Sequence, residues 1–325
     1  MPFLERALDA GEVREALERV LLPEEDSLRV REARLVRHKP GRRALIEYYV
    51  ELARAGGPPR STTLLGKVRA RGLDRRSYRV QGALGESGFG PESADGVSVP
   101  EVLGALPEMH LWLQRRVPGI PATDLLSRAG GEALACRIAE AAHKLHRAEV
   151  LPLRRPHGVA DELYILRERL RLVGRERPDL SGRLEKVLDA CDCLGDALPE
   201  PETCGVHRDF YPDQVLVDGD RIYLLDLDLY CEGDPALDIG NFLGHIEELS
   251  LRTLGDPYAL SGPEAALEER FLELSGGMRR ASVRAYTTLT LARHIQISTL
   301  FADRRPFTGA LLELCEERLG ISRGV

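Results

Sequence analysis

The sequence lacks the features that mark several broad classes of protein. No stretch approaches the roughly 18 consecutive apolar residues of a membrane-spanning helix. The N-terminus carries Glu5, Asp9 and Glu12 where a signal peptide needs an unbroken apolar core. The six cysteines form no CxxC pair and have no histidines at zinc-ligand spacing. We therefore expect a cytoplasmic protein with reduced thiols, no membrane partner and no thiolate metal site.

Acidic residues only slightly outnumber basic residues. The 325 residues carry a formal net charge of −7, which gives no general attraction to nucleic acid or anionic lipid. Such an excess of acid suits a cationic partner, but it is also ordinary for a soluble protein. The sequence has no internal repeats and no low-complexity tail, and its length is enough for two packed domains.

Short runs rich in β-branched and aromatic residues follow an N-terminal helical pattern over residues 3–21. Turn signals such as Pro40-Gly41 separate these runs, so they predict an antiparallel meander. Asp74 is placed to cap a helix that stops near Gly88. The predicted strands are residues 32–39, 44–52, 62–70 and 111–117.

The pattern changes after the last predicted strand, where apolar residues recur at helical spacing. In residues 131–150, for example, Leu134 and Leu145 lie on one stripe of a helix that buries one face. The other predicted helices are residues 160–174, 180–196, 235–250, 263–275, 278–302 and 307–319. We therefore expect an α+β protein with a small antiparallel-sheet lobe over residues 1–117 and a larger, mostly helical lobe over residues 118–325.

One stretch breaks the helical pattern of the second lobe and carries acidic side chains. It reads HRDFYPDQVLV over residues 207–217 and is followed by LLDLD over residues 224–228, with the hairpin dipeptide Asp218-Gly219 between them. Phosphoryl transfer needs a carboxylate to orient the attacking hydroxyl, oxygen ligands for Mg²⁺ and a cation on the phosphates.

The residues of this stretch match those needs. Asp209 supplies the carboxylate, and five residues later the amide oxygen of Gln214 is a candidate metal ligand. The tight turn brings Asp226 and Asp228 back beside the loop, where converging carboxylates favour a bound divalent cation. The alternative is a polar turn with a capping aspartate and a solvated DxD, but the whole combination favours a catalytic site.

The same segments resemble those of the aminoglycoside phosphotransferase and choline kinase group, which has a two-lobed, protein-kinase-like fold. HRDFYPDQVLV is similar to that group's HGDxxxxNxLV, LLDLD to its IDWD, and EGDPALDIGNF to its GDPxxDLA segment. The resemblance covers roughly residues 30–250. It implies that Asp209 is the catalytic aspartate, Gln214 a metal-binding position and Asp226 the principal Mg²⁺ ligand.

The resemblance also implies supporting roles around this centre. Asp234 and Asp238 are expected to support the site, with Asp238 hydrogen-bonded to the catalytic loop. His207 is expected to hold the loop by packing and hydrogen bonding rather than to act as an acid or base.

In the first lobe the resemblance assigns the nucleotide contacts. Lys67, in the middle of a predicted strand, matches the lysine that contacts the α- and β-phosphates and pairs with a helix glutamate. Glu86 is the best partner by position, although an exposed glutamate at a helix end explains it almost as well. The strand WLQRRVPG resembles the group's hinge, which places Arg115, Arg116 and Val117 near an adenine through backbone groups.

Two departures from the group's pattern matter. Gln214 replaces an asparagine, which moves the amide oxygen one methylene further out, although Mg²⁺ demands near-octahedral ligation. Arg208 replaces a glycine. The first hairpin has PGRR rather than GxGxxG, and neither DFG nor APE follows the catalytic segment, which disfavours a protein substrate.

The sequence thus predicts a phosphotransferase that uses ATP or GTP with Mg²⁺ and acts on a hydroxyl of a small molecule such as an aminoglycoside, an amino alcohol or a sugar. The alternative is a kinase-like protein that binds a nucleotide or metabolite with weak or no catalysis because of Gln214. The charge of the acceptor stays open. Candidates for its pocket are Glu247, Glu248, Asp256, the segment EAALEERFLEL, Arg284, Arg293 and His294.

Overall fold

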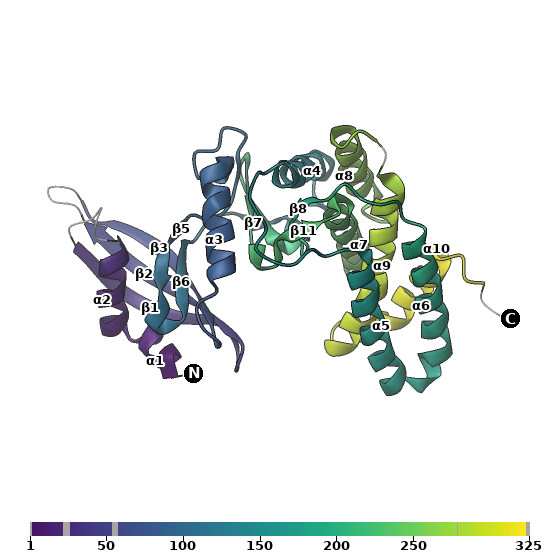
Figure 1. Cartoon of the computed structure of the whole chain (residues 1–325), viewed down its shortest axis with the longest axis horizontal. Helices are drawn as coiled ribbons and strands as arrows, with labels where there is room; N and C mark the ends of the chain where they lie inside the picture. Colours follow the sequence, from purple (N-terminus) through teal and green to yellow (C-terminus); the bar gives the residue numbers. More distant parts are fainter. Residues whose placement is uncertain (1, 22–26, 54–57, 278, 323–325) are drawn as a thin grey trace. The chain divides into compact units, whose positions relative to one another are not determined.

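The computed structural model describes residues 2–21, 27–53, 58–277 and 279–322. The chain forms two compact units. Unit 1 comprises Met1–Gly119 and Asp218–Asp228, and unit 2 comprises Ile120–Val217 and Leu229–Val325. An antiparallel sheet dominates unit 1 and helices dominate unit 2, which confirms the predicted α+β class (Figure 1).

The segment Asp218–Asp228 differs from the predicted division. The predicted boundary after residue 117 assigns it to the helical lobe, whereas it groups with unit 1. The reason is local, because β10 (Arg221–Leu224) pairs in parallel with β4 (Val97–Ser98), and the aspartates after β10 contact basic residues of the sheet. Nucleotide binding by the first lobe and acceptor binding by the second stay predictions.

The main sheet of unit 1 has the strand order β1-β2-β3-β6-β5, and every neighbouring pair in it is antiparallel. The predicted meander is formed by β1, β2 and β3. β5 is absent from the predicted strands, because Gly104, with φ of +156°, interrupts its alternation at a bulge. The strands are β1 (Ser27–Lys39), β2 (Arg43–Ala53), β3 (Arg60–Arg69), β5 (Val102–Leu106) and β6 (Leu111–Arg115).

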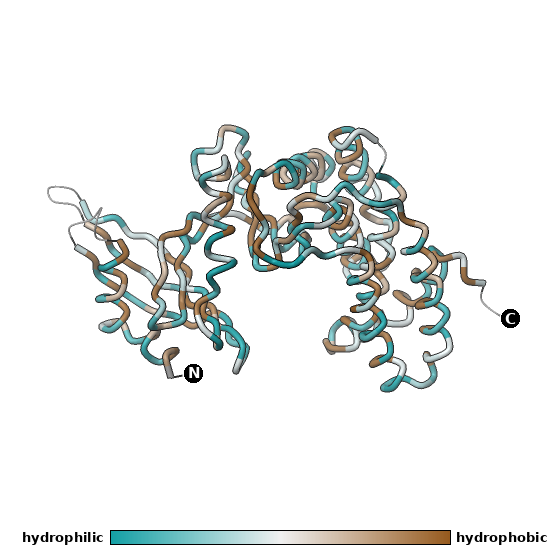
Figure 2. The backbone as a smooth tube through the Cα atoms, in the orientation of Figure 1, coloured by the Kyte–Doolittle hydropathy of each residue, from teal (hydrophilic) through white to brown (hydrophobic). Residues whose placement is uncertain are grey.

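One face of this sheet carries the core of unit 1. Ile46 and Tyr48 pack there against α1 (Pro2–Leu8) and α2 (Ala10–Leu21), the predicted N-terminal helix pair. The Tyr48 hydroxyl donates to the carbonyl of Ala7 at 2.9 Å, which ties the sheet to α1. Figure 2 shows hydrophobic residues recurring along the strands and hydrophilic residues at the tip of the β1–β2 hairpin.

The opposite face carries Lys67, because side chains alternate along a strand. α3 (Arg75–Leu84) reaches this face through Tyr78, whose ring meets Trp112 of β6 edge-on with ring centres 6.1 Å apart. Asp74 caps α3 through its side-chain oxygen, as predicted. The face that holds Lys67 is therefore only partly covered within unit 1.

Helices make up most of unit 2. α7 (Pro235–Leu254) has most of its side chains buried and packs along α9 (Arg280–Leu300). All six cysteines of the chain are free thiols, as predicted. No helix in the described ranges is long and apolar enough to cross a membrane. The other elements of unit 2 include α4 (Gly131–His146), α5 (Val159–Glu176), α6 (Ser181–Asp196), α8 (Ser261–Leu274), α10 (Thr308–Arg318), β7 (Ile120–Pro121), β8 (Cys204–Val206), β9 (Val215–Asp218) and β11 (Cys231–Gly233).

The close approach of α7 and α9 gives a test of the packing in unit 2. A methyl group on Gly240 would lie 2.7 Å from the backbone nitrogen of Thr287. We expect Gly240→Ala to lower the free energy of unfolding by about 1–3 kcal/mol through overpacking. At Gly174 of α5 an added methyl group would meet nothing closer than 3.5 Å. Gly174→Ala is therefore the control, and we expect it to be neutral or to stabilise by up to about 1 kcal/mol. Equal shifts of the urea midpoint for the two variants would contradict this packing.

Candidate active site

A lysine and two aspartates lie together on the partly covered face of the unit 1 sheet. The ammonium group of Lys67 is 3.7 Å from Oδ1 of Asp226, 3.8 Å from Oδ1 of Asp228 and 5.0 Å from the centre of the Trp112 ring. Burial lowers the pKa of Lys67, and the Asp226 carboxylate opposes that shift. The structure thus brings the lysine predicted to bind phosphate to the carboxylates predicted to bind metal.

Asp226 has a backbone conformation that L side chains rarely adopt, with φ of +53°. It lies between the end of β10 and the short 3₁₀ turn Leu227–Leu229, so the chain bends sharply at this residue. A non-glycine residue in this region is strained by about 1–3 kcal/mol, and such strain clusters at functional sites. The strain therefore adds to the reasons for placing Asp226 at the centre of the site.

Asp228 has contacts that differ from those of Asp226. Arg43, Lys67 and Arg69 all form ion pairs with its carboxylate, with Arg43 at 3.8 Å. A carboxylate that three cations already surround is a poor ligand for a further cation. Of the two predicted metal ligands in the DxD motif, the structure therefore favours Asp226.

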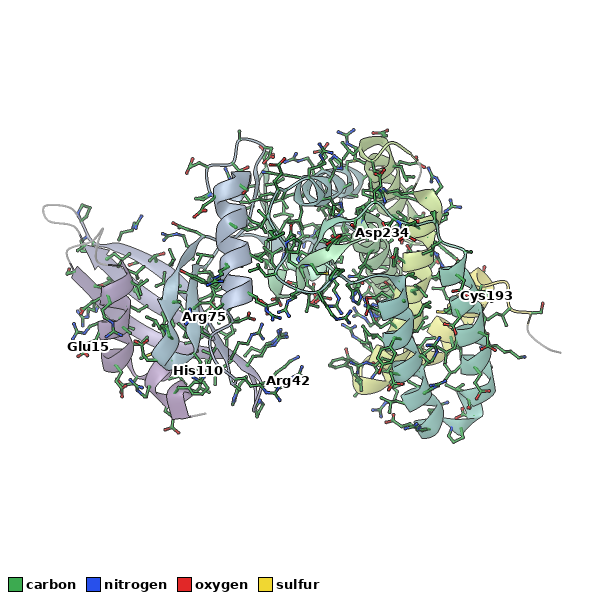
Figure 3. The ribbon with its side chains drawn as sticks, viewed as in Figure 1. Glu15, Arg42, Arg75, His110, Cys193 and Asp234 are labelled. Atoms are coloured by element: carbon green, nitrogen blue, oxygen red, sulfur yellow. The ribbon has the colours of Figure 1, made fainter. Side chains whose placement is uncertain are left out.

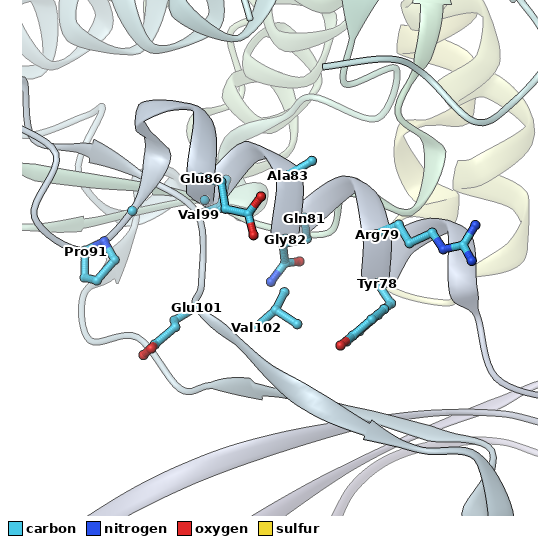
Figure 4. A pocket seen from close by; sticks show the side chains of 12 residues that line it. Tyr78, Arg79, Gln81, Gly82, Ala83, Glu86, Pro91, Val99, Glu101 and Val102 are labelled. Carbon is cyan, nitrogen blue, oxygen red and sulfur yellow. The ribbon is translucent and has the colours of Figure 1, made fainter. Parts of the chain in front are cut away.

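The helix glutamate predicted to pair with Lys67 lies elsewhere. Glu86 follows the last residue of α3 and is exposed, beside a cavity of about 460 Å³ that Gln81 and Val102 also line (Figure 4). Roughly 12 Å of helix separates it from Tyr78, through which α3 reaches the Lys67 face. Among the described residues, Lys67 forms ion pairs with the two aspartates and none with Glu86. The structure therefore shows the exposed glutamate at a helix end rather than the pair.

The predicted hinge follows β6, and most of its backbone donors are occupied. The N–H of Arg115 donates to the carbonyl of Glu101 at 2.9 Å, and the N–H of Arg116 donates to the carbonyl of Thr63 at 3.0 Å. Neither N–H is available to an adenine base. The N–H of Val117 has no backbone partner in the described part of the chain, so of the three residues predicted to lie near an adenine it is the one whose backbone donor is not taken up by the sheet.

In unit 2 a loop of residues 207–214 carries Asp209, and Asp238 of α7 holds this loop. Oδ2 of Asp238 accepts from the His207 N–H at 2.8 Å, and Oδ1 accepts from the Arg208 N–H at 2.7 Å. These bonds confirm the predicted hydrogen bonding between Asp238 and the loop. They fix the two residues that precede Asp209.

The surroundings of Asp238 explain how the loop keeps its conformation. Arg208 has φ of +69°, a left-handed conformation that glycine adopts without strain, and glycine is what the related motif has there. Asp238 is fully buried, and Nε2 of His146 lies 2.9 Å from its Oδ2. Asp234, the other predicted support, caps α7 by accepting from the Ala236 N–H at 2.9 Å. A capped helix and two hydrogen bonds thus stabilise the strained residue.

A second residue of α7 holds the same loop and is absent from the predicted site. The amide group of Asn241 donates to the carbonyl of Phe210 at 2.9 Å, and its oxygen accepts from Arg293 of α9. Arg293 also lies 3.4 Å from Glu162 of α5. The sequence feature that indicates Asn241 is its position three residues after Asp238, because this spacing puts both side chains on one side of the helix.

Gln214 ends the loop and contacts an aromatic side chain. Its amide nitrogen donates to the Tyr211 hydroxyl at 3.1 Å. The Tyr211 ring stacks on His245 with centres 4.5 Å apart, and His245 meets His294 edge-on at 4.4 Å. Burial lowers the pKa of both histidines well below the usual value, so both are neutral near pH 7. The hydrogen bond engages the amide nitrogen of Gln214 and leaves the amide oxygen for a ligand.

The predicted metal ligands come from both units. Asp226 and Asp228 belong to unit 1, and Gln214 belongs to unit 2. The ranges that the structure describes contain no group of three or more His, Cys, Asp or Glu residues able to hold a metal ion. Within unit 1 the predicted donors are the carboxylates of Asp226 and Asp228, and oxygen donors of this kind suit Mg²⁺ because that ion keeps several of its waters.

A family model described as the phosphotransferase enzyme family matches residues 75–271, which is more than half of the 325-residue chain. The chain belongs to this family. No curated protein gives a significant match to the sequence.

Solved structures of small-molecule kinases share the fold of this phosphotransferase. A choline kinase from Cryptosporidium parvum is 13% identical, with a TM-score of 0.62 over 95% of each chain. A choline/ethanolamine kinase family protein from Mesorhizobium loti is 16% identical, with a TM-score of 0.57 over 95% of this chain and 94% of that one. An aminoglycoside phosphotransferase in a ternary complex with ADP and hygromycin B is 17% identical, with a TM-score of 0.59 over 95% of this chain and all of that one. The predicted protein-kinase-like fold is confirmed, and with the family match it makes the chain a small-molecule phosphotransferase.

Two of the acidic residues suggested for the acceptor pocket of the phosphotransferase pair with arginines. Glu247 and Glu248 of α7 are buried. Glu247 pairs with Arg318 at 2.5 Å, and Glu248 pairs with Arg252 at 3.0 Å. These two glutamates therefore present no uncompensated negative charge to a cationic acceptor.

The carboxyl groups of Glu247 and Glu264 give the phosphotransferase a pH-dependent stability. Burial raises the pKa of Glu247 to about 7 and that of Glu264 to about 8, and the charge of Glu247 adds to the second shift. Both values lie above the ordinary 4.5, so the folded state binds these protons more tightly than the unfolded state. Their contribution to stability is complete below the unfolded value and is lost as the pH rises through 7 and 8.

We therefore expect Glu264→Gln to reduce the loss of unfolding free energy between about pH 5 and pH 9 by about 2 kcal/mol, because it removes one of the two titrations. Glu273→Gln, at an exposed position of the same helix, is the control and should keep the wild-type profile. Urea unfolding of the three proteins at both pH values provides the measurement. Identical profiles for wild type and Glu264→Gln would show that this carboxyl does not titrate in the folded protein.

Proposed function

We propose that this phosphotransferase moves the terminal phosphoryl group of ATP to a hydroxyl of a small molecule. Lys67 binds the phosphates that stay with the nucleotide, and Asp226 with Gln214 holds Mg²⁺. Asp209 orients the hydroxyl that attacks. The observation that carries the proposal is the pair of Lys67 and Asp226, which sets a cation for phosphate and a carboxylate for metal 3.7 Å apart.

The protein takes little part in the covalent chemistry of the transfer. The acceptor oxygen forms a bond to the terminal phosphorus while the bond from that phosphorus to the bridging oxygen of ADP breaks. The hydroxyl proton moves to the Asp209 carboxylate, and ADP leaves with the bonding electrons. Asp209 is half-buried, and the two residues before it are fixed by hydrogen bonds that their N–H groups donate to Asp238. Such positioning supplies most of the catalysis in phosphoryl transfer.

The residues present fit a bound Mg²⁺. Asp226 and Gln214 offer the oxygen donors that this ion prefers. When bound, Mg²⁺ supplies positive charge that offsets the charge on the phosphates.

The choice of ATP and of a small acceptor rests on the related structures and on the hinge. The related aminoglycoside phosphotransferase was solved with ADP, which supports an adenine nucleotide. Val117 keeps a backbone donor for such a base. The relatives are named for choline, ethanolamine and aminoglycosides, all of which are small hydroxyl compounds, and this supports an acceptor of the same class.

A second function is a kinase-like protein that binds the nucleotide without useful turnover. The observation that favours it is the hydrogen bond between Gln214 and Tyr211, which ties the predicted metal ligand to another side chain. The strained conformation of Asp226 and the two bonds that hold the Asp209 loop favour catalysis instead, since binding alone requires neither.

Two aspartates of the same loop give a matched test of catalysis. Asp209→Asn removes the carboxylate that receives the proton, so we expect acceptor-dependent ADP release to fall about 100- to 10,000-fold. Asp213→Asn is the control, because Asp213 is exposed and contacts only Thr123 in the described part of the loop. Calorimetric binding of AMP-PNP should be unchanged in both variants. Full turnover by Asp209→Asn would remove Asp209 from the mechanism.

A variant of Gln214 separates the two functions. If Gln214 holds the metal, wild type turns over at least one acceptor in a panel of aminoglycosides, amino alcohols and sugars, and Gln214→Asn changes the rate by about tenfold at most, because the amide oxygen is kept. Tyr211→Phe is the control for loss of the hydrogen bond alone. Wild type that is inactive with every acceptor, together with activity in Gln214→Asn, would establish the binding function.

A further inference from the structure

We propose that unit 1 contains an arginine-lined pocket for an anionic group of the acceptor, next to the Lys67 site. The inference rests on the proposed phosphotransfer and names the chemistry of its acceptor, a hydroxyl compound that already carries a phosphate group. The pocket has a volume of about 600 Å³ and lies between the tip of the β1–β2 hairpin and the turn after β3. Its charged lining residues are Arg42, Arg43, Arg69, Arg71 and Asp74.

The register of the sheet places this pocket beside the Lys67 site. Arg43 pairs with Arg69 across β2 and β3, and Leu45 pairs with Lys67, so the two arginines form the next row on the same face. A smaller cavity of about 90 Å³ is lined by Lys67 and Asp226 and shares Arg43 and Arg69 with the arginine pocket. A ligand in the arginine pocket therefore lies next to phosphates held by Lys67.

The order of residues along β3 separates the pocket from the hinge. Arg115 of the hinge strand pairs with Leu64, which precedes Lys67, whereas Arg69 follows Lys67. At about 3.4 Å per residue, the hinge end lies roughly 10 Å to one side of Lys67 and the arginine row roughly 7 Å to the other. A nucleotide with its base at the hinge and its phosphates on Lys67 ends at the arginine row. The space beyond that row belongs to the molecule that takes the phosphoryl group.

Four arginines and one aspartate line the pocket, so its charge is positive even though Arg43 and Arg69 pair with nearby aspartates. Arg42, which Figure 3 labels at the tip of the hairpin, and Arg71 form no ion pair with any described residue. Repulsion from Arg43, together with burial and two further arginines, lowers the pKa of Lys39 on the neighbouring strand. An anion bound among these side chains relieves the repulsion, so the arrangement favours anionic ligands and repels amines.

The size of the pocket and the chemistry of its side chains favour a phosphorylated small molecule. The volume falls within the roughly 300–1,000 Å³ of small-molecule sites, so there is room for more than a single phosphoryl group. Guanidinium groups bind phosphate oxygens through paired N–H donors. A sugar phosphate or a similar hydroxyl-bearing phosphate ester has both the anionic group for the arginines and the hydroxyl for transfer.

The first test is calorimetric titration of the full chain with inorganic phosphate, with and without saturating Mg²⁺ and AMP-PNP. We expect phosphate to bind with the nucleotide present, and Arg71→Glu to weaken that binding at least about tenfold, as expected for hydrogen bonds between charged groups. Arg76→Glu is the matched control, since it makes the same charge change at an exposed position of α3 outside the pocket and should have little effect. Arg42→Ala is a second variant and keeps the test valid if Arg71→Glu fails to fold.

Each other result of the titration contradicts the proposal in a distinguishable way. Loss of phosphate binding when AMP-PNP is present assigns the pocket to the nucleotide's own terminal phosphate. Equal weakening by Arg71→Glu and Arg76→Glu reduces it to general charge attraction, and no binding in either state removes the site. Failure of AMP-PNP to bind counts against the proposed function instead, while the phosphate titration without nucleotide still reports on the arginines.

Turnover gives the second test. With a sugar phosphate and its parent sugar as paired acceptors, we expect kcat/KM to favour the phosphorylated compound in wild type and in Arg76→Glu. The preference should fall at least about tenfold in Arg71→Glu through a higher KM, with KM for ATP unchanged. A preference that survives in Arg71→Glu, or a preference for cationic acceptors, overturns the assignment.

Discussion

The half-buried ammonium group of Lys67 is the constraint on which the rest of the site depends. A buried cation needs a partner, and Asp226 supplies one at 3.7 Å. In the proposed function a phosphate would pair with the lysine and a divalent cation with Asp226, so each charge of the pair would keep a partner of opposite sign.

The proposed reaction also requires a rigid loop around Asp209. Two side chains from the first turns of α7 hold that loop. Asp238 binds the N–H groups before Asp209, and Asn241 binds the carbonyl of the residue after it. Hydrogen bonds on both sides leave the Asp209 backbone little freedom. They also hold Arg208 in a left-handed conformation, which explains how the loop is built without the glycine of the related motif. The paired charges of Lys67 and Asp226 thus belong to unit 1, and the loop that carries Asp209 belongs to unit 2.

Local patterns predicted most of the fold, and the family resemblance supplied the predicted roles of the residues at the centre of the site. Residues 44–52 and 62–70 are β-branched runs bounded by turn signals, and strands cover both. The resemblance of EGDPALDIGNF to the group's GDPxxDLA segment implied the Asp238 contact to the loop, and the structure shows that contact. Lys67 and Asp226 were named as phosphate and metal residues, and the structure brings their side chains together.

The features that were not predicted depend on contacts between residues far apart in the sequence, which no local pattern contains. Glu86 was predicted as the partner from its position along the chain, but it lies beyond the end of α3, and Tyr78 of that helix reaches the Lys67 face instead. The arginines around Asp228 depend on the register between β2 and β3, which places Arg43 opposite Arg69. β5 was not predicted because the bulge at Gly104 adds a residue and so breaks the alternation of apolar and polar residues by which strands are recognised.

The central proposal is that Asp226 holds one hydrated metal ion against the nucleotide phosphates that Lys67 binds. A crystal structure with AMP-PNP and Mn²⁺ tests it most directly, because the anomalous signal of manganese locates the ion independently of the protein. We expect one manganese peak about 2.1 Å from a side-chain oxygen of Asp226, with a phosphate on Lys67. A peak without that oxygen in its coordination shell, or a nucleotide bound away from Lys67, would contradict the proposal.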